Sequence, residues 1–245
     1  MQKKAYIDEL KEAFGQKGCA FCRLLDESAD KFVDAVLWEM VNDPKTRLEL
    51  RHTRGYCPEH SQMLIRPGAA LGTAILMKDV VNTLQKEVQN SRLWGDESSL
   101  RSLRGAIGGK RPSAKTAELL QKLEPQATCP ACVNVADLKK HLIKSFTQNL
   151  NQLAEPYQQS DGLCLSHFKE LLAETGNVDT AQTLLQAQMH IWERLDAELA
   201  EFIRKNDYRF QHEGFGTEKD SWMRGVEAIA GTLPQNRQNK KGLTQ

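Results

Sequence analysis

The chain has 245 residues, of which 33 are Lys or Arg and 32 are Asp or Glu, so its formal net charge at pH 7 is +1. This balance argues against the strong overall field that draws a protein to nucleic acid or to an acidic membrane surface. The N-terminal residues are charged, unlike those of a signal peptide, and no apolar run approaches the length that spans a bilayer. We therefore expect a cytoplasmic protein with no membrane partner.

Two long helices are predicted in the first part of the chain. Apolar residues recur at helical spacing after Cys22, and Asn42-Asp43-Pro44 is expected to end that helix. The residues of this first stripe are Leu25, Ala29, Phe32, Val36 and Met40. A second stripe marks a helix after His60, and its residues are Met77, Val81, Leu84 and Val88.

The same arrangement occurs again in the second part of the chain. A helix is predicted after Cys132, ending at Glu155-Pro156, and its stripe consists of Val135, Leu138, Leu142, Phe146 and Leu150. A further stripe follows His167 and consists of Leu184, Gln188, Trp192, Leu195, Leu199 and Phe202. The two stripes that follow His60 and His167 are narrow, as in helical bundles, and we find no alternating strand pattern. The predicted fold is all-α, with helical modules forming a bundle.

Composition divides the chain into four predicted segments. Residues 95–112 are rich in Gly, Ser and basic residues and are predicted to be a flexible linker. Residues 232–245 are polar and are predicted to be a disordered tail. Residues 1–94 then form a first helical module, and residues 113–231 form a second module that ends in a C-terminal helix.

All six cysteines belong to one motif that is written twice. Cys19-x-x-Cys22 is followed by Cys57-x-x-His60 after 34 intervening residues, and Cys129-x-x-Cys132 is followed by Cys164-x-x-His167 after 31. Three thiolates and one imidazole form a complete tetrahedral ligand set for zinc. In a reducing compartment, paired cysteines favour metal over disulfides. We therefore predict two zinc ions, one in a Cys3His site within each module.

The residues around these motifs suit metal binding. Pro58 after Cys57 predicts a helix start, where the positive end of the helix dipole favours a thiolate, and the Cys-x-x-His spacing places both ligands on one face. Arg23 or Arg54 could balance the net negative charge of a three-thiolate zinc site. Because four protein ligands leave no position for water, a structural role is favoured over a catalytic one.

Two other groups of residues are candidate binding sites. Arg47, Arg51 and Arg54 surround His52 and could form a phosphate-binding patch, although a solvated helix face whose charges pair with Glu49 is the simpler interpretation. The linker adds a run of basic residues without an acid between them: Arg101, Arg104, Lys110, Arg111 and Lys115. A mobile basic segment can bind phosphate backbones, but no aromatic residues interleave with these charges.

The C-terminal segment is the remaining candidate for a functional surface. Its candidate residues are Asp207, Tyr208, Arg209, His212, Asp220, Trp222 and Arg224. Asp220 or Ser221 is predicted to cap a helix that begins near Trp222. The acids of this segment, with His212, could line a polar cleft. The alternative is a glycine-permitted turn that docks the last helix through aromatic residues.

The paired motifs resemble those of a family of uncharacterised bacterial and archaeal proteins of about this length. That family carries two Cys-x-x-Cys…Gly-x-Cys-x-x-His modules and a terminal segment similar to Asp207-Tyr208-Arg209…Asp220-Ser221-Trp222-x-Arg224. The resemblance covers most of the chain apart from the linker and the tail. It implies paired metal modules and brings no reaction with it.

The sequence thus favours a non-catalytic zinc-binding scaffold or adaptor that presents a helical surface to a protein partner or to a second copy. No P-loop, dinucleotide-binding, nucleophile-elbow or His-Glu-x-x-His motif is present, so we predict no catalytic residues. Two alternatives stay open. One is a nucleic-acid-binding protein that uses the Arg47–Arg54 cluster and the basic linker. The other is a thiol-based redox or zinc switch.

Overall fold

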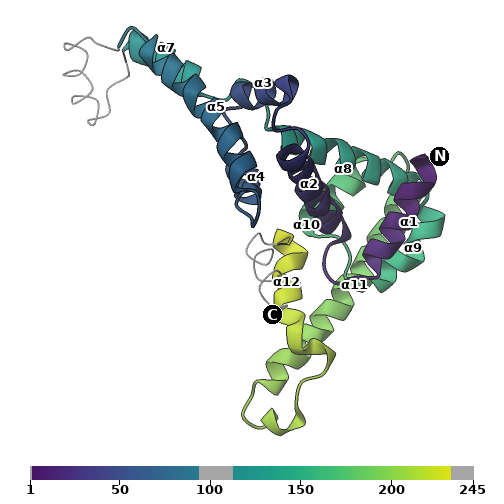
Figure 1. Cartoon of the computed structure of the whole chain (residues 1–245). Helices are drawn as coiled ribbons and strands as arrows, with labels where there is room; N and C mark the ends of the chain where they lie inside the picture. The colour runs from purple at the N-terminus through teal and green to yellow at the C-terminus, as the bar shows by residue number, and fades with distance from the viewer. Residues whose placement is uncertain (1, 94–112, 233–245) are drawn as a thin grey trace. The chain divides into compact units, whose positions relative to one another are not determined.

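The structure is a computed structural model that describes residues 2–93 and 113–232, and all regular elements in these residues are helices (Figure 1). The predicted all-α fold is confirmed. The α-helices are α1 (Gln2–Phe14), α2 (Ala20–Trp38), α3 (Pro44–His52), α4 (Pro58–Ser61), α5 (Ala70–Gln89), α7 (Ala114–Leu123), α8 (Pro130–Gln148), α9 (Leu150–Gln159), α10 (Leu165–Ala173), α11 (Val178–Lys205) and α12 (Ser221–Ala230). Three short 3-10 helices join them: η1 (Gln62–Leu64), η3 (Gln211–Glu213) and η4 (Thr217–Asp220).

The predicted linker at 95–112 lies outside the described residues, as does the predicted tail beyond Thr232. The described chain divides into two compact units. Unit 1 contains Met1–Glu27 and Asp137–Gln245, and unit 2 is Ser28–Ala136. These bounds differ from those of the predicted modules, because α2 and α8 each contribute one part to unit 1 and the other part to unit 2.

In unit 1 the core is built around aromatic side chains. Phe146 packs edge-on against Phe14, Phe21 and Tyr157, with ring centroids 5.3–6.4 Å apart. The Tyr157 hydroxyl is fully buried and donates a hydrogen bond to the side-chain oxygen of Gln188, which is also buried. A buried hydroxyl without a partner would cost free energy, so Gln188 within α11 fixes the position of α9.

In unit 2 the core is aliphatic and includes residues next to the cysteine motifs. Its buried members come from α2, α3, α5, the start of α8 and the segment between α4 and α5. They are Val33, Val36, Leu37, Leu50, Leu64, Ala69, Leu76, Val80, Cys129 and Ala131. Of the predicted α5 stripe, Met77 and Leu84 pack against this core, whereas Val81 is half exposed.

Contacts between α2 and α8 run in opposite directions along the two helices. Within unit 1, Phe21 in the first turn of α2 packs against Phe146 in the last turn of α8. Within unit 2, Ser28 further along α2 donates a hydrogen bond of 2.8 Å to Asn134 near the start of α8. In unit 1, therefore, the start of α2 lies beside the end of α8, and in unit 2 the start of α8 lies beside the middle of α2.

The predicted helix end at Glu155-Pro156 is wrong. The helix that follows Cys132 ends at Gln148, and Pro156 lies inside the next helix, α9. The break occurs at Asn149, whose backbone leaves the helical region at φ −126° and ψ 29°. Leu153 and Tyr157, on either side of Pro156, are fully buried, so tertiary packing holds the helix across a residue that usually interrupts one.

The predicted end of the first helix is close to the observed one. The helix predicted after Cys22 is α2, which ends at Trp38. Asp43 then caps α3 by accepting a 2.7 Å hydrogen bond from the backbone N–H of Thr46. Among the described residues, none of the helices combines the length and the apolar character needed to cross a bilayer.

Candidate metal centres

Each of the four cysteine motifs begins immediately before a helix. Cys57 and Cys164 are the N-cap residues of α4 and α10, with nearly identical backbone angles: φ −63°, ψ 165° and φ −65°, ψ 159°. Cys19 and Cys129 directly precede α2 and α8, and their carbonyl groups accept the first helical hydrogen bonds of those helices. The second ligand of each motif is the third residue of the helix. The prediction that a helix begins at Pro58 is confirmed.

A glycine with positive φ introduces the third cysteine of each motif pair. Gly55 has φ +93° and Gly162 has φ +79°, a region that other residues adopt at a cost. The turn brings the chain out of the preceding segment and into the helix that carries Cys-x-x-His. The glycine two residues before each third cysteine is thus required by the backbone conformation.

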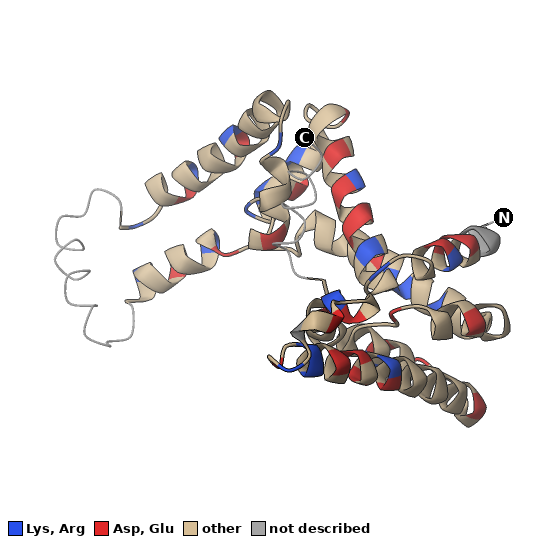
Figure 2. Cartoon of the chain, turned by 90° about the horizontal axis from the view of Figure 1, so that it is seen from below, with Lys and Arg blue, Asp and Glu red and all other residues tan. Residues whose placement is uncertain are grey.

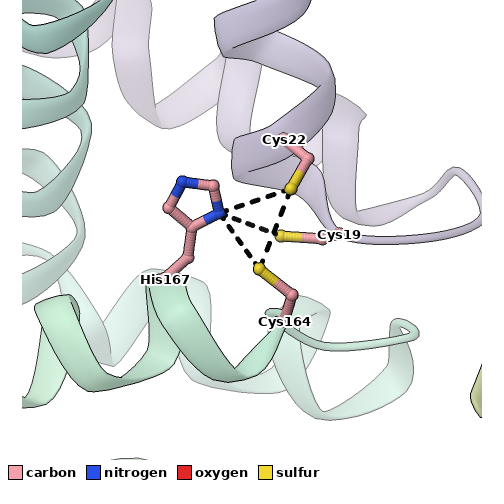
Figure 3. A group of neighbouring side chains, drawn as sticks. All are labelled: Cys19, Cys22, Cys164 and His167. Carbon is pink, nitrogen blue, oxygen red and sulfur yellow. Dashed lines mark hydrogen bonds between the residues drawn. The ribbon is translucent and has the colours of Figure 1, made fainter. Parts of the chain in front are cut away.

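The first cluster consists of Cys19, Cys22, Cys164 and His167, all in unit 1 (Figure 3). Figure 3 shows the three sulfur atoms and the Nδ1 face of the imidazole turned toward one another from α2 and α10. The Nδ1 atom of His167 lies 3.5, 3.4 and 3.3 Å from the sulfurs of Cys19, Cys22 and Cys164. The Cys22 and Cys164 sulfurs are 3.8 Å apart.

The second cluster consists of Cys57, His60, Cys129 and Cys132, all in unit 2. The Nδ1 atom of His60 lies 3.2 Å from the Cys57 sulfur, 3.4 Å from that of Cys132 and 3.8 Å from that of Cys129. The sulfurs of Cys57 and Cys132 are 3.7 Å apart. Both clusters therefore present three sulfurs and one imidazole nitrogen around a common centre, and each could hold a metal ion.

The pairing of the motifs predicted from their order in the sequence is wrong. All eight predicted ligands are brought together, but Cys19-x-x-Cys22 meets Cys164-x-x-His167, and Cys129-x-x-Cys132 meets Cys57-x-x-His60. The halves of each site come from different copies of the repeat. Cys22 and His167 are separated by 145 residues, and His60 and Cys132 by 72.

The direction of α2 and α8 explains this crossed pairing. A helix of 19 residues is about 28 Å long, so α2 carries the chain away from Cys19, and the nine-residue α3 covers only about half that distance. Because the start of α8 lies against α2 within unit 2, Cys129 and Cys132 arrive where the chain that follows α2 places Cys57 and His60. The similar gaps in the two copies are compatible with either pairing.

Within the first cluster, the surroundings of Cys164 favour its thiolate. Hydrogen bonds from the Cys19 and Cys22 side chains, aided by the backbone N–H groups of Ser166 and His167, lower the pKa of Cys164 to about 3. Cys19 is shifted the other way, because its hydrogen bonds with Cys164 and Cys22 and its burial raise its pKa. In the second cluster, burial and a hydrogen bond with Cys57 raise the pKa of Cys132 to about 12. Three sulfurs this close cannot all be anionic without a cation among them.

The arginines proposed to balance these clusters have other partners. Arg23 donates hydrogen bonds to the carbonyl groups of Lys17 and Gly18, which shapes the turn before Cys19. Arg54 donates to the carbonyl of Lys122 and pairs with Glu87 at 3.6 Å. Both therefore hold backbone segments near the cysteines.

The Arg47–Arg54 cluster is engaged within unit 2. Arg47 and Arg51 both bind the carboxylate of Asp79, at 3.3 and 3.0 Å, which ties α3 to α5. His52 is exposed, and its carbonyl accepts a hydrogen bond from the backbone of Gln126. Of the predicted basic linker, Arg101, Arg104, Lys110 and Arg111 lie outside the described residues. Figure 2 shows basic and acidic residues following one another along the same helices.

The acids of the C-terminal segment form separate ion pairs instead of converging on His212, which is exposed. Asp207 binds Arg209, and Tyr208 between them is 82% exposed. Further along, Glu213 pairs with Arg204, and Glu218 pairs with Lys205 at 2.7 Å; the Lys205 ammonium is the main reason why the pKa of Glu218 falls to about 2. These pairs fold the turn between α11 and α12.

Asp220, Trp222 and Arg224 lie at the start of α12. The helix begins at Ser221, close to the predicted position, but neither Asp220 nor Ser221 makes a capping hydrogen bond to its backbone. Asp220 binds Lys17 and Arg224 instead. Trp222 is half exposed.

A small cleft lies beside the first cluster, between its two ligand loops, α11 and α12. Its lining residues include Cys19 and Cys164, and its volume of about 20 Å3 holds roughly one water molecule. Charged side chains border it: Asp161, Arg194, Arg224 and Glu227. The cleft can admit a water-sized reagent and is too small for a substrate of metabolite size.

The chain belongs to a family of unknown function, DUF6062, whose model matches residues 1–236. It is similar to an uncharacterised 23.9 kDa protein in the xynA 3′ region of Caldicellulosiruptor sp. (strain Rt8B.4), with 25% identity over 225 residues, which cover 90% of this chain and 98% of that protein. No solved structure matches the chain. The expected membership of an uncharacterised family is confirmed; the crossed Cys3His clusters are a feature of this chain's own geometry.

Proposed function

We propose that the protein is a non-catalytic helical scaffold in which two structural zinc ions, one in each Cys3His cluster, hold distant parts of the chain together. The carrying observation is the geometry of the two ligand sets. Each offers four soft or borderline donors within 4.8 Å of one another, as a thiophilic ion requires.

The distances between the donor atoms match the edges of a zinc tetrahedron. With Zn–S bonds of about 2.3 Å and a Zn–N bond of about 2.0 Å, tetrahedral angles give about 3.8 Å between sulfurs and about 3.5 Å between sulfur and nitrogen. The sulfurs of Cys22 and Cys164 are 3.8 Å apart in the first cluster, and those of Cys57 and Cys132 are 3.7 Å apart in the second. The sulfur–nitrogen distances lie between 3.2 and 3.8 Å. The donor sets therefore fit zinc without rearrangement.

A structural role follows from the closure of both sets. Four protein ligands fill the coordination sphere, so no position is left for a zinc-bound water or a substrate. The cleft beside the first cluster is of water size. Each ion also closes a long loop, which is costly to order without a cross-link, because the two motifs that supply its ligands are 69 to 148 residues apart.

The scaffold role rests on the helical surfaces that unit 1 offers. Large apolar side chains are exposed along α11 and α12, and such positions are typical of protein contacts when they gather on one face. They are Val178, Leu185, Met189, Ile203, Trp222, Met223, Val226 and Ile229. We infer a protein partner or a second copy as the binding partner.

The nucleic-acid alternative has less support. Arg47 and Arg51 share Asp79, and Arg54 is held by Glu87 and a carbonyl group. A phosphate would have to displace these carboxylates. Binding of this kind would depend steeply on salt. If the protein is not retained on immobilised DNA or RNA at low salt, the nucleic-acid alternative is wrong.

Metal analysis of the purified full-length protein tests the proposal. We expect about two zinc ions per chain, as two closed four-ligand sites require. Cys57→Ser and Cys164→Ser should each remove one. A fully helical protein with no bound metal, purified in the presence of zinc, would overturn the proposal.

A further inference from the structure

The last described helix, α12, docks in unit 1 with its apolar face outward. Trp222, Met223, Val226 and Ile229 lie on one side of the helix and are 43–62% exposed. The side turned inward carries small and charged residues: Ser221 is fully buried, and Gly225 lies close enough to α11 that an added Cβ would touch Leu199. Apolar burial, the usual force that holds a terminal helix, contributes little to this contact.

Arg224 is the main attachment of α12. Its guanidinium binds Glu198 of α11, Asp220 at 2.9 Å and, at 3.8 Å, Asp161. Asp161 also accepts a 2.7 Å hydrogen bond from the backbone N–H of Gly18. Gly18 directly precedes Cys19, and Asp161 lies three residues before Cys164. Asp161, one of the three carboxylates around Arg224, therefore also joins the two loops that carry the ligands of the first cluster.

The C-terminal end of α12 lies directly on the sulfurs of the first cluster. Gly231, at the C-cap, has φ +81°, and a Cβ built there would be 3.2 Å from the Cys22 sulfur and 3.5 Å from the Cys164 sulfur. Arg224, Glu227 and Ala228 of the same helix form one wall of the cleft that leads to Cys19 and Cys164. The helix thus touches the cluster at one end and borders its approach along its length.

We propose that α12 is a latch over the first cluster, which slows the access of small reagents to its thiolates and is itself docked only while those thiolates share a metal ion. The proposal rests on the metal binding proposed above. A bound ion holds the loops of Gly18 and Asp161 together, and Asp161 then lies beside the Arg224 guanidinium. Without the ion the first cluster no longer joins the two loops, so they can move apart, and α12 loses its contact with Asp161 and with the sulfurs beside Gly231.

The second cluster serves as a comparison within the same chain. It has the same four donor types, but two of its cysteines, Cys57 and Cys132, are partly exposed, whereas Cys22 alone is partly exposed among the three cysteines of the first cluster. A reagent that attacks metal-bound thiolates should therefore reach the second cluster sooner.

Cadmium-113 substitution of the full-length protein gives a direct test, since each cluster then contributes its own NMR resonance. On addition of excess EDTA, we expect the second cluster to lose its ion first. Arg224→Ala should speed loss from the first cluster roughly tenfold, as removal of about 1.4 kcal/mol from the closed state would do. Loss from the second cluster should stay within about twofold.

Two control variants separate the latch from general loosening. Arg209→Ala removes an exposed arginine of the same segment whose contacts are local, an ion pair with Asp207 and a cation–π contact with Phe210, and it should change neither rate. Gly231→Ala should shift the resonance of the first cluster, because the new methyl group meets its sulfurs. Gly214→Ala introduces the same backbone strain at φ +68° with open space around it and should not shift it.

Hydrogen exchange of the unmodified protein provides a second measurement that needs no variant. Removal of metal from the first cluster should raise the exchange rates of the α12 amides at least tenfold relative to the loaded protein. Two cadmium resonances would show that both clusters bind metal. If α12 then stayed protected after metal removal, or if Arg224→Ala did not speed loss of the ion from the first cluster, the latch alone would be overturned. The absence of any bound metal would instead overturn the proposed function.

Discussion

Cys19 and Cys57 belong to the same copy of the motif but to different clusters, whereas Cys19 and Cys164 share a cluster across the two copies. Double variants can measure this pairing by counting ions. Cys19→Ser with Cys164→Ser damages one site twice, so about one zinc per chain should remain under a competing chelator. Cys19→Ser with Cys57→Ser damages both sites, so close to none should remain.

If each copy of the motif formed its own site instead, these two zinc counts would be reversed. Atomic absorption on the two double variants, with each single variant as control, therefore separates the pairings even if every variant is destabilised. One ion retained in the Cys19–Cys57 double variant would contradict the structure.

Gly55 and Gly162 occupy equivalent turns with different surroundings. An added Cβ at Gly55 meets nothing within 4 Å, so Gly55→Ala should cost only the left-handed strain of about 1–2 kcal/mol. At Gly162 the methyl group would lie 3.0 Å from Ile191 and 3.2 Å from the Gln188 amide. Overpacking should add about 1–3 kcal/mol there.

Hydrogen-exchange mass spectrometry can read these two costs separately, since each glycine lies in a different unit. Gly162→Ala should raise exchange in unit 1 more than Gly55→Ala raises it in unit 2. Equal effects would show that the turn conformation alone requires both glycines.

At the scale of helices, the pair formed by α3 and α5 depends on one carboxylate. Asp79→Asn leaves Arg47 and Arg51 without their shared partner, and we expect unit 2 to lose about 1 kcal/mol of stability. Glu118→Gln removes an exposed pair within α7 and should cost about 0.3 kcal/mol. Thermal unfolding of the zinc-loaded proteins compares the two, and a smaller loss for Asp79→Asn would contradict the tie between α3 and α5.

The helices were predictable from the sequence because their signals are local. Apolar spacing located α2, α5, α8 and α11, and a proline after a cysteine marked the start of α4. The helix end predicted at Pro156 was wrong because the burial of Leu153 and Tyr157 outweighs the tendency of proline to interrupt a helix. The missing cap at α12 has a similar cause, since Asp220 binds Arg224 one turn further along α12 and Lys17, which is far away in the sequence.

Across the whole molecule, each cluster joins two segments that lie far apart in the sequence. Apparent binding free energies of structural zinc are about 10–16 kcal/mol, comparable with or larger than the net stability of a domain. Chelation of both ions should therefore unfold much of the described chain, seen as a loss of helical circular dichroism. Retention of the full helical signal after verified metal removal would mean that the ions are dispensable.

A single lost site should have a graded effect, because α2 and α8 contribute to both units. In Cys57→Ser, hydrogen exchange should increase in unit 2, including the later part of α2 and the first turns of α8. The first turns of α2, which hold Cys22, should stay protected. Uniform exchange over both units would show that the two sites stabilise one cooperative whole.

Ligand identity was predictable and ligand pairing was not, and the difference is physical. Residue type and the Cys-x-x-Cys and Cys-x-x-His spacings are fixed within one helical turn, so His60 and His167 could be recognised as ligands. Which motif meets which depends on the direction in which α2 and α8 pack, and that is set by contacts such as Phe21 with Phe146. The same holds for Arg224, whose attachment to Asp161 no spacing predicts.

The crossed pairing also sets an order for biosynthesis. While the ribosome makes the chain from its N-terminus, Cys19, Cys22, Cys57 and His60 all emerge before any ligand of the second copy exists. The nascent chain then holds one full ligand set that the finished protein never uses together. The second cluster can close once Cys132 has emerged, and the first must wait for His167. Early metal capture by the first four ligands would put Cys19 and Cys57 into one site, and that site would have to open again before either native cluster could close.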